Sequence, residues 1–117
     1  MGTRGNDRQI DNIEFNVADI TRSREFYGKA FGWSFTDYGP TYCEFNDGRM
    51  TGGFTTGAAA RPGGALIILN ADDLAAAHRR LEKAGARITR PAYAFPGGRR
   101  CHFVDPDGYE LAVWSSD

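Results

Sequence analysis

One stretch of the sequence decides the fold, and it reads Arg99-Arg100-Cys101-His102-Phe103-Val104-Asp105-Pro106-Asp107-Gly108-Tyr109-Glu110-Leu111-Ala112-Val113-Trp114. Apolar runs rich in Val, Phe, Tyr and Trp lie on both sides of its Asp-Pro-Asp-Gly turn, and they predict a β-hairpin. Proline presets the backbone early in a turn, Asp accepts local backbone hydrogen bonds, and Gly adopts positive φ at little cost. Because residues of like parity face each other in a tight hairpin, we expect Arg100 and His102 beside Ala112 and Trp114.

The size and composition are those of one globular domain. The chain has 117 residues, of which 41% are hydrophobic and 25% charged, and no apolar run is long enough to span a membrane. A net charge of −1 creates no overall field that would recruit nucleic acid or an anionic membrane. Cys43 and Cys101 lack zinc-site spacing, and the polar residues 1–11 contain no signal-peptide core. We therefore expect a cytoplasmic protein with reduced thiols.

Two segments of the chain repeat the same plan. Residues 1–8 form a polar tail that we expect to be disordered, and one domain follows over residues 9–117. A helix over 23–31 is capped by Asp19 or Thr21 and ended by Gly32. A second helix over 74–84 has the same signals at nearly the same offset, Asp72–Asp73 and Gly85.

The repeat predicts an α+β fold made of two copies of strand–helix–strand–strand–strand, with about eight strands and two helices. The first module covers about residues 9–56, a Gly/Ala/Pro-rich linker covers 57–64, and the second module covers about 65–115. We expect the sixth strand over 86–89, and a mobile lip or a simple loop at Gly97–Gly98.

The strands have two different faces. The odd-numbered face of the first strand (Ile13, Phe15 and Val17) is apolar, so it should pack on a helix. The even-numbered face is polar in the first strand and apolar in the fifth, where it carries Leu66 and Ile68. A concave surface with both characters is typical of a small-molecule pocket.

An ordered set of residues resembles a known superfamily. In the first module the set is Ile13-Glu14-Phe15-Asn16-Val17-Ala18-Asp19, Phe26-Tyr27 and Phe31-Gly32-Trp33. In the second it is Asp72-Asp73-Leu74, Leu81, Ala84-Gly85 and Phe103-Val104-Asp105-Pro106-Asp107-Gly108-Tyr109-Glu110-Leu111. Together they resemble the vicinal oxygen chelate superfamily of glyoxalases, bleomycin-resistance proteins and extradiol dioxygenases. The resemblance implies two βαβββ modules whose mixed sheet curls around one cavity, assembled as a homodimer.

The resemblance also implies where a metal would bind. In metal-dependent members the ligands come from the first and last strands of each module, at positions that fall here on Asn12, Leu66, about Gly52, and Ala112. Leu, Gly and Ala have no side-chain donor atom, and Asn is a poor ligand for a transition metal. We therefore predict no metal and no cofactor. Drug-sequestering members use the cavity without a metal, and this chain is similar to them.

Two residues are candidates for catalysis. Glu14 is a ligand-binding group or a general base, or it is a partner of Arg100, or it lies in an open, wet groove. His102 is a proton shuttle, a hydrogen-bond donor to a ligand, or a half-buried strand residue, and with Glu14 it could form a displaced metal site. Arg100 binds an anionic group or is surface charge. His78 should lie on a solvated helix face, and Trp33 in the core.

The predicted function is metal-independent binding of a partly aromatic or apolar small molecule. The predicted ligand-binding residues are Asn12, Glu14, Tyr42, Leu66, Ile68, Arg100, His102 and Trp114, of which Tyr42 and Trp114 offer stacking surfaces or simply fill the core. The alternative is a glyoxalase-like lyase or isomerase with Glu14 and His102 as its acid–base pair, or with a displaced metal. A third interpretation is a structural or regulatory dimer. No interpretation involves nucleic acid or a membrane.

Overall fold

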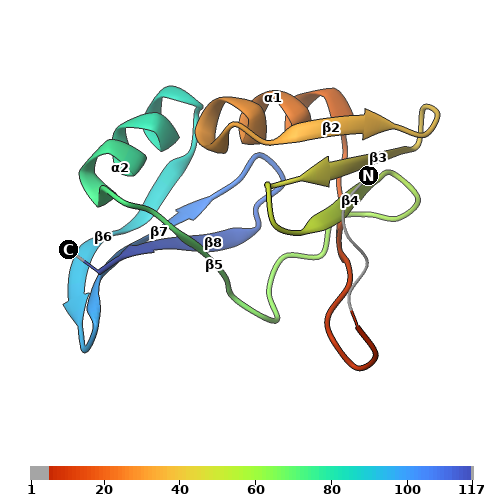
Figure 1. Ribbon diagram of the computed structural model, residues 1–117. Coiled ribbons are helices and arrows are strands. Elements are labelled where there is room, and N and C mark those ends of the chain that lie inside the picture. The colour runs from red at the N-terminus through yellow and green to blue at the C-terminus, as the bar shows by residue number, and fades with distance from the viewer. Residues whose placement is uncertain (1–5, 117) are drawn as a thin grey trace. The chain divides into compact units, whose positions relative to one another are not determined.

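The computed structural model describes residues 6–116 and contains the two predicted βαβββ modules (Figure 1). The chain divides between Ala60 and Arg61 into two compact units, and each is described separately as module one and module two. The tail predicted for residues 1–8 lies mostly outside the described residues. Its last part is a turn in which the Gln9 amide donates to the Asn6 carbonyl at 3.1 Å.

Module one is a four-stranded sheet with one helix. Its elements are β1 (Ile13–Asn16), α1 (Ile20–Phe31), β2 (Ser34–Asp37), β3 (Tyr42–Asn46) and β4 (Thr51–Thr55). The strand order is β1-β4-β3-β2, with β1 parallel to β4 and the other pairs antiparallel. A parallel pair needs a long crossover connection, which α1, β2 and β3 supply here.

The helix α1 begins at Ile20, earlier than the predicted Ser23, because Asp19 is the cap. The Asp19 carboxylate accepts from the Arg22 amide at 3.2 Å. Gly32 ends the helix with φ of 70°, as predicted, and its amide donates to the Gly28 carbonyl at 2.9 Å.

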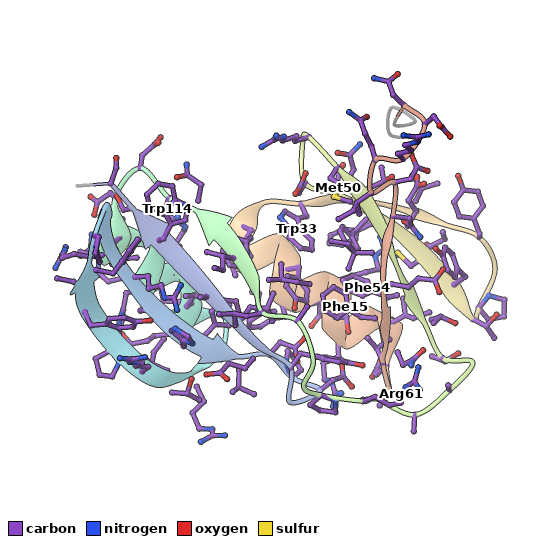
Figure 2. The ribbon with its side chains drawn as sticks, turned by 90° about the horizontal axis from the view of Figure 1, so that it is seen from below. Phe15, Trp33, Met50, Phe54, Arg61 and Trp114 are labelled. Carbon is purple, nitrogen blue, oxygen red and sulfur yellow. The ribbon has the colours of Figure 1, made fainter. Side chains whose placement is uncertain are left out.

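The core of module one is aromatic. Phe15 and Val17, which directly follows β1, are buried, and Ile13 is half-buried, so the odd-numbered apolar face predicted for the first strand does face the core. The rings of Phe15 and Phe54 lie 6.1 Å apart (Figure 2), and Tyr27 stacks on Phe54 at 5.5 Å. Trp33, predicted in the core, is half-buried at its margin, where it stacks on Tyr27 at 4.6 Å.

Module two repeats the arrangement. Its elements are β5 (Ile67–Asn70), α2 (Leu74–Lys83), β6 (Arg87–Phe95), β7 (Gly98–Val104) and β8 (Glu110–Ser115), in the sheet order β5-β8-β7-β6. The Asp73 carboxylate caps α2 by accepting from the Ala76 amide at 3.1 Å. Leu74, Ala77 and Leu81 are buried, as predicted.

The hairpin of β7 and β8 has the predicted register. Arg100 pairs with Trp114, and His102 pairs with Ala112. In the turn, the buried Asp105 carboxylate accepts from the amides of Asp107 at 2.9 Å and Tyr109 at 3.0 Å. This turn is therefore held by its own side chain, as its sequence indicates.

The predicted end of the sixth strand was wrong. β6 continues from Arg87 past Pro91 to Phe95, instead of ending at Thr89. Proline is tolerated because β6 is the edge strand, and the register shifts on both sides of Arg90. The predicted lip or loop at Gly97–Gly98 belongs to the tight turn that joins β6 to β7, in which Phe95 pairs with Gly98.

Neither helix in the described part of the chain is long and apolar enough to cross a membrane.

Candidate functional site

Glu14, Tyr42 and Gly53 form a cluster on the face of the first sheet that carries the even-numbered residues of β1. The Tyr42 hydroxyl on β3 donates to the Glu14 carboxylate on β1 at 3.0 Å, although β4 lies between these two strands. Gly53 on β4 pairs with Glu14 on one side and Glu44 on the other. A Cβ atom at Gly53 would collide with the Tyr42 hydroxyl and ring. The glycine therefore leaves the space through which Tyr42 reaches Glu14.

The pKa of Tyr42 is raised above its ordinary value, mainly because burial disfavours the phenolate. The hydrogen bond to Glu14 and the charges of Glu14 and Glu44 raise the pKa further, while a hydrogen bond with Asn12 lowers it. Tyr42 is therefore a neutral hydrogen-bond donor at neutral pH. Glu14 itself is exposed, so its carboxylate is open to solvent or a ligand.

The His102 chain is a series of hydrogen bonds in module two. The His102 Nε2 atom lies 3.0 Å from the Tyr93 hydroxyl, and its Nδ1 atom lies 3.3 Å from the Glu110 carboxylate. The Thr89 hydroxyl donates to the same carboxylate oxygen of Glu110 at 3.2 Å. Arg100 donates its Nε proton to the Tyr93 hydroxyl, which leaves the tyrosine proton for His102 Nε2. This pattern assigns the His102 proton to Nδ1, where it faces Glu110.

Two rows of paired residues cross the second sheet on the face that carries His102. The first row is Ile68, Ala112, His102 and Arg90. The second row is Asn70, Trp114, Arg100 and Tyr93. The rows bring together four side chains predicted for the site, since Ile68, Arg100, His102 and Trp114 share this face.

Apolar groups on this face remain open to solvent. The exposed fractions are 44% for Ile68 and 36% for Leu66, which precedes β5. Trp114 is half-buried, and its ring makes an edge contact with Phe95 at 6.2 Å. His102 is only 8% exposed, so its imidazole is much less accessible than these apolar side chains.

Sequence reasoning missed Tyr93, Arg90, Glu110 and Gly53. Tyr93 and Arg90 were missed because the predicted sixth strand ended at Thr89. Glu110 has the same parity as Ala112, so the hairpin register could have placed it on the His102 face. The predicted pairs of Glu14 with Arg100 and with His102 join different modules, and they stay predictions.

The structure corrects one position inferred for a metal ligand. Glu14 pairs with Gly53, just as Ile68 pairs with Ala112, so the first-module counterpart of Ala112 is Gly53 and not Gly52. A Cβ atom at Gly52 would instead meet Phe45 on the buried face. The turn after Gly48 has one residue more than the turn after Gly108, which shifts the count.

A metal does not fit the family's positions in this chain. Leu66, Gly53 and Ala112 carry no donor, and Asn12 alone cannot hold a transition metal. Within residues 6–116, no group of three or more His, Cys, Asp or Glu side chains is arranged to hold one.

A separate hollow of about 300 Å³ in module two contains none of the predicted site residues. It is lined by Leu74, Ala75, His78, Arg79, Ala92 and Arg99. His78, expected on a solvated face, is half-buried with its Nε2 atom 3.5 Å from the Glu82 carboxylate. Both cysteines are buried and free, and burial raises the pKa of the Cys43 thiol to about 11.

Two βαβββ modules, each with a mixed four-stranded sheet, define a glyoxalase-like α+β protein. The chain belongs to the glyoxalase/bleomycin resistance protein/dioxygenase superfamily, whose family model matches residues 9–113. No curated protein sequence matches the chain significantly.

Solved structures show the same fold. A glyoxalase-related enzyme from Fulvimarina pelagi has 27% identity and a TM-score of 0.79, over 92% of this chain and 88% of that chain. The fosfomycin resistance protein from Mesorhizobium loti has 21% identity and a TM-score of 0.78, over 92% of each chain. An antibiotic binding protein from Streptomyces sp. CB03234 has 21% identity and a TM-score of 0.74, over 92% and 94% of the two chains.

Proposed function

We propose that this protein binds a partly aromatic or apolar small molecule without a metal ion. The observation that carries the proposal is the mixed face of module two. Exposed Ile68 lies there in the same row as His102, and Trp114 lies in the same row as Arg100. Apolar surface beside a few convergent polar groups is typical of ligand sites.

The residue chemistry supports metal independence, because the family's ligand positions carry no adequate donors. Among proteins with this fold, one is described as an antibiotic binding protein and another as a fosfomycin resistance protein. A binding function is therefore compatible with the fold. Assembly as a homodimer and a cytoplasmic location are further parts of the proposal, and light scattering of the purified protein tests the first.

A second candidate function is enzymatic. The His102 imidazole lies between the Glu110 carboxylate and the Tyr93 hydroxyl, an arrangement that can orient the ring and pass a proton. A lyase or isomerase would use this imidazole as its acid–base group. If so, a His102→Gln variant should still bind the ligand but lose turnover, whereas a pure binding protein shows no turnover in either form.

Thermal melts of EDTA-treated protein test the main proposal. Ni²⁺, Zn²⁺, Mn²⁺ and Fe²⁺ are added singly, followed by a set of small aromatic compounds. A ligand at ~100 times its Kd adds about 2.7 kcal/mol to the free energy of unfolding. For a chain of this length that corresponds to a midpoint shift of roughly 10 °C.

We expect no saturable shift with any of the four metals, and a saturable shift with at least one aromatic compound. The aromatic shift should shrink in Trp114→Ala and persist in Trp33→Phe, because Trp33 packs in module one. A saturable rise with one metal would overturn metal independence, and a flat response to every aromatic compound would overturn the binding function.

A further inference from the structure

One tyrosine holds two arginines on the His102 face of module two. The Cζ atom of Arg90 lies 3.6 Å from the centroid of the Tyr93 ring, which places the guanidinium directly against the ring. Arg100 donates its Nε proton to the Tyr93 hydroxyl, and its Cζ atom is 5.5 Å from the same centroid. Tyr93 therefore positions both cationic groups.

Neither arginine has a carboxylate partner among residues 6–116. Glu110, the carboxylate of the His102 chain, receives its hydrogen bonds from Thr89 and His102 instead. Arg24 in module one shows the contrasting case, since its Nη1 group donates to both carboxylate oxygens of Asp37, at 2.9 and 2.8 Å. Arg90 and Arg100 thus keep N–H donors that no anion of the described chain uses.

Aromatic side chains adjoin the arginines. The Cζ atom of Arg100 lies 5.8 Å from the centroid of the Phe95 ring, and Phe95 contacts Trp114. Arg100 and Trp114 are also direct cross-strand neighbours. A ligand held by the arginines would therefore have aromatic surface available for the rest of its body.

We propose that Arg90 and Arg100 bind the oxyanion of an aromatic carboxylate or phosphate whose ring packs against Phe95 and Trp114. This inference rests on the proposed binding function and names the chemical class of the ligand. The planar guanidinium offers paired N–H donors that match the two oxygens of a carboxylate or phosphate. Tyr93 acts as a positioning residue.

Isothermal titration calorimetry at low salt tests the inference with three probes that share one ring system. The probes are 1-naphthoate, 1-naphthyl phosphate and the neutral 1-naphthalenemethanol. We expect at least one anion to bind tenfold or more tightly than the alcohol, with an advantage that falls as salt is added. Whichever anion binds more tightly identifies the oxyanion as carboxylate or phosphate.

Variants separate this site from general surface charge. Arg90→Gln and Arg100→Gln should each reduce the anion-to-alcohol affinity ratio at least fivefold. Arg87→Gln, at the start of β6, is the matched control and should leave the ratio unchanged. Tyr93→Phe keeps the ring under Arg90 but removes the hydroxyl that holds Arg100, so it should lower the ratio less than the loss of Arg100. Thermal melts establish that each variant is folded.

The outcomes distinguish the inference from the function on which it rests. If the alcohol binds as tightly as both anions, or if the arginine variants keep the wild-type ratio, the inference is overturned and aromatic binding stands. If none of the three probes binds, the inference is overturned together with the support for an aromatic ligand.

Discussion

Substitution of Gly53 by alanine should disconnect Tyr42 from Glu14. The three atoms nearest to a Cβ built at Gly53 all belong to Tyr42, and they lie too close for the ring to keep its position. The ring would have to turn away, and the 3.0 Å hydrogen bond from its hydroxyl to Glu14 would be lost.

The structure allows the size of this effect to be worked out. Loss of the hydrogen bond should lower the free energy of unfolding by about 0.5–1.5 kcal/mol, and a less favourable rotamer of the ring should lower it by about as much again. Replacing a strand glycine by alanine should raise it by about 0.5–1 kcal/mol, because glycine loses more conformational freedom on folding. Gly53→Ala should therefore destabilise the protein by about 1 kcal/mol.

The same substitution should have the opposite sign when Tyr42 is already alanine. With no ring to displace, only the gain from replacing glycine remains, and Gly53→Ala should stabilise the Tyr42→Ala protein by about 0.5–1 kcal/mol. The expected coupling between the two positions is therefore about 2 kcal/mol. Urea unfolding of the wild type, both single variants and the double variant measures it. Equal destabilisation by Gly53→Ala in both backgrounds would refute the proposed role of Gly53.

Two further predictions concern buried side chains of module one. Because burial raises the pKa of Cys43 from 9.0 to about 11, the folded state holds more protons than the unfolded state between these values. This thiol should therefore lower the free energy of unfolding by about 2 kcal/mol between pH 9 and pH 11. In urea unfolding the loss should be smaller by about that amount in Cys43→Ala than in the wild type, since Cys101 and Tyr42, whose pKa values burial also raises, remain in the variant; equal losses in the two proteins would contradict the prediction. Phe54 has no exposed surface and packs against Phe15, Tyr27 and Phe45. Phe54→Ala should therefore lower the free energy of unfolding, measured in urea, by about 3–5 kcal/mol. Phe35 is half-buried, so Phe35→Ala should lower the free energy of unfolding clearly less than Phe54→Ala does. Similar losses at the two positions would show that burial does not set the size of the effect.

Features that depend on neighbours in the sequence were predictable. The Asp-Pro-Asp-Gly turn carries its own hydrogen-bond acceptor and a residue that tolerates positive φ, so it set the register of β7 and β8 and placed Arg100 and His102 beside Trp114 and Ala112. Asp73 and Gly32 marked helix ends because capping acts within one turn. The repeat of these local signals was sufficient to predict the fold class.

The polar clusters needed the tertiary structure. Tyr42 reaches Glu14 across an intervening strand, and only the register of β4 shows that the residue in between is a glycine. Tyr93 meets His102 and Arg100 because β6 continues through a proline, which its position at the sheet edge permits. The sequence by itself therefore determined the modules, the helix caps and the hairpin, since each follows from contacts within a few residues. The tertiary structure decided which side chains form the candidate site, because cross-strand neighbours depend on pairing between segments far apart in the chain.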